Sequence, residues 1–186
     1  MQATLAAAPR GPRWYQWRMS VSSLTRAVIG GVVAGAAGTA AMDLLLYARY
    51  RRGGGDQDPL AWETARGVDD WQRAPAPARV AQKIAAMAGI ELPSDAVRTT
   101  TNVMHWSYGT GWGSLLGLGQ AMGMRAGIFR GIVFGSLVWA FDYAVLPPMG
   151  IYQPAWEYGA ETLWKDLSAH LLYGAVAGGV AENLAD

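Results

Sequence analysis

The chain contains only two histidines, and each begins the same nine-residue pattern, H-x-x-Y-G-x-x-x-G. The first copy consists of His105, Tyr108, Gly109 and Gly113, and the second of His170, Tyr173, Gly174 and Gly178. Both copies lie in apolar stretches, where an ionisable side chain is costly and usually serves a function. The pattern predicts a duplicated unit with a paired polar site, but it names no reaction.

Two aspartates lie in apolar stretches at a depth similar to that of the histidines. A helix rises about 1.5 Å per residue, so Asp43 and His105 lie roughly 10 Å inside the charged ends of their segments. Asp142 and His170 lie about 8 Å inside theirs. All four groups are therefore predicted in one leaflet, with two tyrosines one helical turn deeper on the histidine faces. The predicted proton or ligand site consists of Asp43, His105, Tyr108, Asp142, His170 and Tyr173.

Three interpretations of this site remain open. In the first, the aspartates accept hydrogen bonds and only lock the helices together, at about 0.6 kcal/mol per bond. In the second, an aspartate and a histidine that titrates near neutrality exchange a proton. In the third, His105 and His170 bind a haem axially, or the same histidines bind a transition metal together with Asp43 and Asp142. Asp166, four residues before His170, lies on the same helix face and is close enough to interact with it.

Composition limits the classes of function. The chain has 186 residues and a formal net charge of +1, so no basic surface favours nucleic acid as a partner. It has no cysteine, which excludes disulfides, thiolate metal sites and a cysteine nucleophile. No nucleophile–base motif, nucleotide-binding loop or metal-hydrolase spacing occurs, so an enzyme is the least supported class. The 24 glycines and nine tryptophans suit closely packed membrane helices with interfacial aromatic belts.

Four apolar segments approach the length needed to cross a bilayer as helices. They cover residues 27–47, 103–124, 127–147 and 165–184. A soluble helical bundle is the alternative, but its helices would show a polar stripe that these segments lack. The sequence predicts an all-α, polytopic membrane protein with four transmembrane helices in a single transmembrane domain, residues 26–186. Residues 1–25, which place Trp14 and Trp17 among arginines, are predicted to form an interfacial segment.

A long polar insert, residues 53–97, separates the first two segments. Asp58 and Pro59 are typical of a helix start, with the aspartate as the cap and the proline in the first turn. A second, amphipathic helix is predicted over residues 78–89, with an apolar face opposite a basic one, as in helices that lie on a membrane surface. A small exposed hairpin packed on the spans is the alternative. Ser94 is predicted to cap the next helix.

The loop of residues 147–158 is rich in proline and aromatic residues. Its prolines restrict the chain, and its position over the leaflet of the histidines suits a cover for the site. Trp156 and Glu157 are therefore predicted to belong to a lid. An interfacial aromatic anchor is the alternative interpretation of this loop.

The four segments are predicted to arise from an internal duplication. The first and third superpose at a shift of 99 residues, which aligns Asp43 with Asp142, and the second and fourth superpose at a shift of 65. Both two-helix repeats start on the same side of the membrane, so they are predicted to be parallel and related by a pseudo-two-fold axis along the membrane normal. Glycines four residues apart occur in all four segments and are predicted packing positions. The distribution of arginines predicts an N-terminus inside the cell.

The second half of the chain has an apolar helix that ends in a Pro-Pro turn, then a loop of proline and aromatic residues and a last helix with glutamate and histidine. The residues concerned are Leu146-Pro147-Pro148-Met149-Gly150, Pro154, Trp156, Tyr158, Glu161 and His170-Leu171. In this layout, mainly over residues 126–178, the chain resembles the YagU-like family of uncharacterised bacterial inner-membrane proteins. The resemblance implies a multi-pass protein of the bacterial cytoplasmic membrane with a connection to acid tolerance, and it transfers no activity.

The sequence thus predicts an integral membrane protein whose paired Asp/His/Tyr site takes part in proton-linked transport or a pH response. The alternatives are a haem- or metal-binding subunit and an accessory or assembly subunit of a larger membrane complex. The predicted partners are the lipid bilayer and either other membrane subunits or further copies of this chain.

Overall fold

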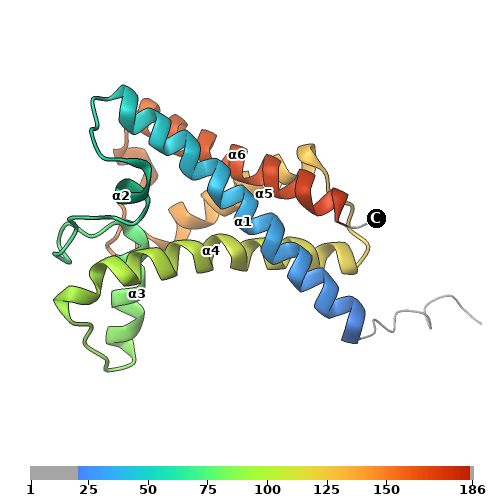
Figure 1. Cartoon of the computed structure of the whole chain (residues 1–186), viewed down its shortest axis with the longest axis horizontal. Coiled ribbons are helices and arrows are strands. Elements are labelled where there is room, and N and C mark those ends of the chain that lie inside the picture. The colour runs from blue at the N-terminus through green and yellow to red at the C-terminus, as the bar shows by residue number, and fades with distance from the viewer. Residues whose placement is uncertain (1–20, 185–186) are drawn as a thin grey trace, which may run out of the picture.

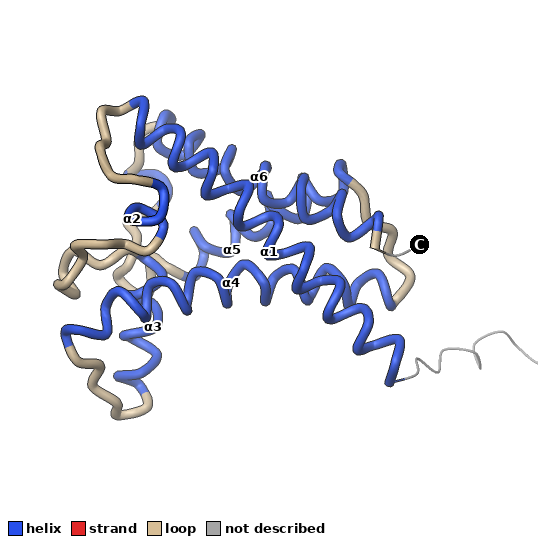
Figure 2. The backbone as a smooth tube through the Cα atoms, viewed as in Figure 1, coloured by secondary structure: helices blue, strands red, loops and turns tan. Residues whose placement is uncertain are grey.

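The structure, a computed structural model, describes residues 21–184, which form helices and loops without a strand (Figure 2). The four long helices are α1 (Val21–Arg52), α4 (Val97–Ala121), α5 (Ile128–Val145) and α6 (Ala160–Asn183) (Figure 1). The shorter elements are α2 (Pro59–Glu63), α3 (Ala76–Met87) and two 3-10 turns, η2 (Ser94–Ala96) and η3 (Ala155–Glu157). The prediction of an all-α fold is confirmed.

Each predicted span lies on one long helix, although the boundaries differ. α1 continues to Arg52, beyond the predicted end at residue 47, and its last turn is rich in arginine, which favours a helix C-terminus. α4 begins at Val97 rather than at residue 103, and α6 begins at Ala160 rather than at residue 165. Two of the four helices, α1 and α5, are long and apolar enough to cross a membrane. α4 and α6 carry the histidines and tyrosines of the predicted site, which lower their hydropathy.

The apolar side chains of α1 and α5 point largely away from the protein. Within the most apolar window of each helix, 33% of the α1 residues and 22% of the α5 residues are buried. Phe129 and Leu137 on α5 are 77% and 62% exposed, and Leu44 on α1 is 70% exposed. A core helix of a water-soluble bundle would bury such a face. These exposed apolar faces are compatible with a membrane environment.

Glycines bring the helices of each pair into direct backbone contact. A Cβ atom at Gly35 of α1 would lie 2.5 Å from the carbonyl oxygen of Gly109 and 3.0 Å from the Cα of Gly113, both on α4. A Cβ atom at Gly131 of α5 would collide with the carbonyl oxygen of Gly174 on α6. Such close approach is the main source of attraction between helices in lipid. The predicted packing role of these glycines is confirmed.

The two helix pairs, α1 with α4 and α5 with α6, have equivalent patterns of glycine contacts. Gly113 packs against the carbonyl group of Gly31, and Gly178, 65 residues later, packs in the same way against that of Gly127. α4 and α6 therefore correspond at the predicted shift of 65. α1 and α5 correspond at a shift of 96, so the predicted shift of 99 is wrong by three residues. Relative to these glycines, the second aspartate lies almost one turn further along its helix than the first.

The two pairs do not follow a complete two-fold relation. α1 packs along α6 as well as α4, and Arg49 near its end donates a hydrogen bond of 2.6 Å to the carbonyl oxygen of Lys165. A two-fold axis would bring α5 equally close to α4. These two helices meet mainly through long side chains, such as Trp112 and Phe141, whose ring centroids are 5.2 Å apart. The predicted symmetry therefore fails on the α4–α5 side.

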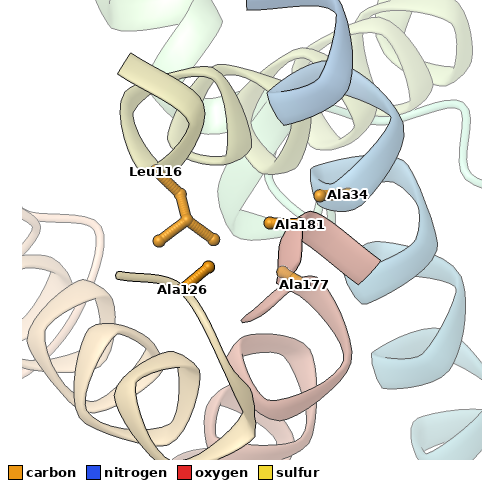
Figure 3. Close-up of a cluster of buried hydrophobic side chains, with 5 residues drawn as sticks. All are labelled: Ala34, Leu116, Ala126, Ala177 and Ala181. Carbon is orange, nitrogen blue, oxygen red and sulfur yellow. The ribbon is translucent and has the colours of Figure 1, made fainter. Parts of the chain in front are cut away.

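Small side chains fill the centre of the bundle near the end away from the insert (Figure 3). Ala34, Ala177 and Ala181 are at most 1% exposed, and they pack with Leu116 and Ala126. Alanine at these positions allows α1 and α6 to approach each other beside α4. Small residues at helix interfaces are typical of membrane bundles.

The insert folds against the end of the bundle where α1 ends and α4 begins (Figure 1). Asp58 caps α2 as predicted, because its side chain accepts a hydrogen bond of 2.9 Å from the backbone N–H of Ala61. α3 begins two residues before the predicted start and packs along α4, where Ala78 and Val97 are fully buried. The insert thus packs on the long helices, as the second of its two interpretations predicts.

Two other predictions for the first half have a different outcome. Ser94 makes no capping hydrogen bond with its side chain, so the predicted cap is wrong. The chain enters α4 through η2, and the N–H of Val97 is satisfied by the carbonyl oxygen of Ser94 instead. Of the predicted interfacial segment, residues 21–25 form the first turns of α1. The remainder, with Trp14 and Trp17, lies outside the described residues.

The glycine contacts predict that alanine substitutions at two glycines of α1, five residues apart, differ in their effect on the free energy of unfolding. Gly35→Ala should destabilise the fold by about 1–3 kcal/mol, because the new methyl group collides with rigid backbone of α4. Gly30→Ala meets nothing within 4 Å and should leave stability unchanged or raise it by up to about 1 kcal/mol through helix propensity. Denaturant titration in detergent measures both. Equal stability of the two variants would contradict the packing described above.

Candidate functional site

The first histidine–aspartate pair joins α1 to α4. Nε2 of His105 lies 3.0 Å from each carboxylate oxygen of Asp43. Asp43 is 7% exposed, and the helix contact at Gly35 and Gly109 holds the two helices close enough for the side chains to meet. A neutral imidazole that carries its proton on Nε2 satisfies this contact with an ionised aspartate.

The second pair joins α5 to α6. Nε2 of His170 lies 3.2 Å from a carboxylate oxygen of Asp142, which is 8% exposed. The other ring nitrogen, Nδ1, lies 3.0 Å from the backbone carbonyl oxygen of Asp166 and 3.6 Å from its carboxylate. The predicted local interaction between Asp166 and His170 is therefore present, and this histidine lies between two carboxyl groups.

The hydrogen-bond partners of His170 fix the proton content of the second pair. A carbonyl oxygen only accepts, so a hydrogen bond at this contact runs from Nδ1–H of His170 to the backbone carbonyl oxygen of Asp166. The contact between Nε2 and Asp142 then needs a further proton, held either by the imidazole or by the carboxyl group. Both contacts of His170 are hydrogen bonds only when the second pair holds one proton more than a neutral histidine beside an ionised aspartate. The contact between His105 and Asp43 needs no additional proton, so the two pairs differ in the number of protons that their hydrogen bonds require.

The tyrosines link the two halves of the chain rather than completing each half. The hydroxyl of Tyr108, on α4, donates a hydrogen bond to Asp142 on α5. The hydroxyl of Tyr173, on α6, donates to the carbonyl oxygen of Gly109 on α4 at 2.6 Å. Its ring fits beside Gly38, where a Cβ atom would lie 2.8 Å from a ring carbon. The site therefore joins Asp142, His170 and Tyr108, whereas Tyr173 serves a backbone contact.

Sequence reasoning missed one acidic residue, Glu63 of α2. Its carboxylate accepts a hydrogen bond of 3.1 Å from the indole N–H of Trp106, and its ligand atom lies within 4.8 Å of those of Asp43 and His105. Burial raises the pKa of Glu63, and the negative charge of Asp43 raises it further. No sequence signal places Glu63 here, because the flexible insert allows α2 many positions along the bundle.

A cavity of about 550 Å³ opens where α4 and α5 separate. Both histidines, Asp142, Tyr108 and Tyr173 line it, whereas Asp43 lies behind His105 and does not. Its walls are otherwise largely apolar and aromatic, with contributions from Met42, Val80, Ile84, Met104, Trp112 and Phe141. A largely apolar pocket with a few converging polar groups is the usual form of a small-molecule site. The structure thus brings five of the six predicted site residues to one cavity.

The roof of the cavity differs from the predicted lid. Trp156 is 85% exposed, Glu157 is exposed, and neither lines the cavity. The same loop contributes Met149 and Tyr152 instead, together with one face of α3. Arg79 of α3 ties the two parts together through hydrogen bonds of 2.9 and 3.2 Å to carbonyl oxygens of the loop. Burial and nearby carboxylates raise the pKa of Tyr152, so the roof presents a neutral hydroxyl.

The donor atoms do not suit the two predicted cofactor arrangements. Axial haem ligation would require Nε2 of both His105 and His170 to leave the hydrogen bond to its own aspartate, and neither aspartate would then have a ligand role. A metal bound by both pairs together would need Asp43 and Asp142 to converge, but only the second of these lines the cavity. The geometry instead separates the site into a cluster around His105 and a chain of hydrogen bonds through His170.

Comparisons with models of protein families, with curated proteins and with solved structures found no match to this chain. The resemblance to the YagU-like family therefore stays a prediction.

A double-mutant cycle tests the second pair as a structural contact. His170→Ala and Asp142→Ala should show a coupling energy near the average of about 0.6 kcal/mol for membrane hydrogen bonds, and no more than about 1.7 kcal/mol. His170→Ala combined with Asp43→Ala serves as the control and should show no coupling, because these side chains do not touch. Unfolding in detergent gives all the free energies. Absence of coupling in the first cycle would contradict the observed contact.

Proposed function

We propose that the protein is an integral membrane protein in which all four long helices cross the bilayer. α1 and α5 are long and apolar enough for this, and their exposed side chains require an apolar surrounding. α4 and α6 would cross with them because each is held to its apolar neighbour by backbone contact at glycines. Their polar groups face the cavity and other helices, as ionisable groups do in membrane proteins.

The same proposal includes the bacterial cytoplasmic membrane as the location, with the N-terminus inside. The insert and the 147–158 loop lie at one end of the bundle, and the turn between α4 and α5 lies at the other end (Figure 1). A four-span arrangement places these two ends on opposite sides of the membrane. Lipid would cover the exposed faces of α1 and α5, and these faces would equally accept other membrane subunits or a second copy of the chain.

Single cysteines can test this topology because the sequence contains none of its own. Asp69→Cys in the insert and Glu157→Cys in the loop replace exposed residues at one end, and Arg125→Cys replaces one at the other. A membrane-impermeant maleimide should label the first two from the same side and the third only from the opposite side. Labelling of all three from one side of sealed vesicles would reject the four-span topology.

We propose that the cavity is a ligand site whose occupancy is linked to a proton, in proton-linked transport or a pH response. The observation that carries this proposal is the hydrogen bonding of His170. Its two ring nitrogens contact acceptor oxygens of Asp166 and Asp142, so a proton must be shared between His170 and Asp142. A histidine is the side chain best suited to give up or take up such a proton near neutral pH.

The residues that share this proton line the cavity, so a ligand bound in the cavity would contact them. His170, Asp142 and Tyr108 all line the cavity, and the two ligand-facing donors converge on the same carboxyl group. Loss of the proton would leave acceptor atoms of His170 and Asp142 facing each other, which would weaken the contact between α5 and α6. A ligand that donates a hydrogen bond to Asp142 would replace the lost contact. Proton release and ligand binding are linked in this arrangement.

Infrared spectroscopy during a pH titration of the purified protein tests the shared proton. The wild-type protein should show a change in the bands of a carboxylic acid or an imidazolium, and Asp142→Asn should remove it because an amide does not bind the proton. Asp69→Asn serves as the control. Asp69 is an exposed carboxylate whose ion-pair partner is Arg73, which also pairs with Asp70, so this variant should leave the infrared signal intact.

Measurements of proton flux distinguish a site that shares a proton from a site that transports protons across the membrane. In liposomes with a trapped pH indicator, proton uptake driven by a membrane potential should fall at least tenfold in His170→Gln relative to the wild type. An infrared signal that survives in Asp142→Asn would reject the shared proton itself. A normal infrared signal without any proton flux would reject transport and leave the pH response as the function.

A further inference from the structure

Three donor side chains from three separate helices meet beside the first histidine. Asp43 comes from α1, Glu63 from α2 and His105 from α4, and one potential ligand atom of each lies within 4.8 Å of the other two. α2 reaches this place because the insert folds back against the ends of α1 and α4 (Figure 1). Asp43 is buried, and the other two side chains are partly buried.

The spacing of these atoms is close to that of a metal coordination sphere. Bonds of about 2.1 Å from a zinc ion place two tetrahedral ligands about 3.4 Å apart. Nε2 of His105 lies 3.0 Å from both oxygens of Asp43, so this pair needs almost no rearrangement to hold an ion between them. Glu63 would complete a three-ligand set by a small movement of its side chain.

The local charge also favours a cation. Among the described residues, neither Asp43 nor Glu63 forms an ion pair with lysine or arginine, and His105 is the single basic partner of Asp43. Two neighbouring carboxylates in a partly buried place repel each other unless a positive charge compensates them. A divalent ion between them would remove this repulsion.

We propose that Asp43, Glu63 and His105 bind one divalent transition-metal ion of the Zn²⁺ type. One imidazole nitrogen with two carboxylate oxygens is a donor set that such ions accept, and three protein ligands leave a fourth position for water or another ligand. The indole N–H of Trp106 donates to Glu63 and would hold this ligand in place, as outer hydrogen bonds commonly do in metal sites. Trp106 is a positioning residue in this scheme.

The second histidine provides an internal comparison. Its two carboxyl neighbours face opposite ring nitrogens, Asp142 at Nε2 and Asp166 at Nδ1, so they do not converge on one point. At His105 the ligand atoms of Asp43 and Glu63 lie within 4.8 Å of one another and of one ring nitrogen. The metal proposal is therefore confined to the first histidine and does not rest on the proton shared by the second.

Calorimetric titration of the full chain in detergent with Zn²⁺, after treatment with a chelator, tests the proposal. The wild-type protein should bind one Zn²⁺ per chain. Glu63→Gln, which keeps the size of the side chain but removes its charge, should weaken binding at least tenfold. Trp106→Phe should weaken binding about tenfold through the loss of the positioning hydrogen bond.

Two variants control for unspecific effects. Glu91→Gln removes an exposed carboxylate of the same insert and should bind Zn²⁺ as the wild type does. His170→Gln should also retain the site, because the second pair contributes no ligand. Unchanged affinity in Glu63→Gln, or equal loss in Glu91→Gln, would show that Zn²⁺ binds elsewhere and would overturn the proposal. Absence of stoichiometric binding to the wild-type chain would overturn it as well.

Discussion

Backbone contact between glycines is the constraint on which the rest of the structure depends. At Gly35 and Gly109, and again at Gly131 and Gly174, two helices approach so closely that even a methyl group would not fit. In lipid this contact supplies the attraction that the hydrophobic effect supplies in water. Each histidine lies four residues, about one turn, before such a glycine. The glycine contact thus decides which aspartate each histidine can reach.

The unequal packing of the four helices creates the cavity. α1 packs along both α4 and α6, whereas α5 has close backbone contact only with α6 among the long helices described. The space between α4 and α5 is then bridged by Tyr108, Trp112 and Phe141 rather than closed by glycines. A fully symmetric arrangement would have filled this space with helix backbone. The cavity exists because the second half of the protein departs from the packing of the first.

Much of this arrangement follows from sequence patterns, and the part that does not has a physical reason. Apolar length and the rarity of charges locate the four helices, and residue rise places Asp43 beside His105 and Asp142 beside His170. The three-residue error in the repeat alignment arose because two rare aspartates were aligned, whereas packing follows the glycines. The position of Glu63 depends on how a flexible insert folds back, and no local pattern encodes that long-range contact.

The repeated motif therefore fixes the position of each histidine beside an aspartate, whereas residues outside the motif determine which second carboxylate lies near the histidine. In both copies a histidine meets an aspartate of the neighbouring helix at similar depth.

The two copies differ in the second carboxylate near the histidine. At His170 it comes from Asp166 on the same helix, four residues earlier, and it lies 3.6 Å from Nδ1, the ring nitrogen that does not face Asp142. At His105 the corresponding position is Thr101, whose hydroxyl donates to the backbone of its own helix. The second carboxylate there is supplied by Glu63 of the insert, and its ligand atom lies within 4.8 Å of those of Asp43 and His105. The same sequence pattern thus has a second carboxylate from its own helix in one half and a second carboxylate from the insert in the other.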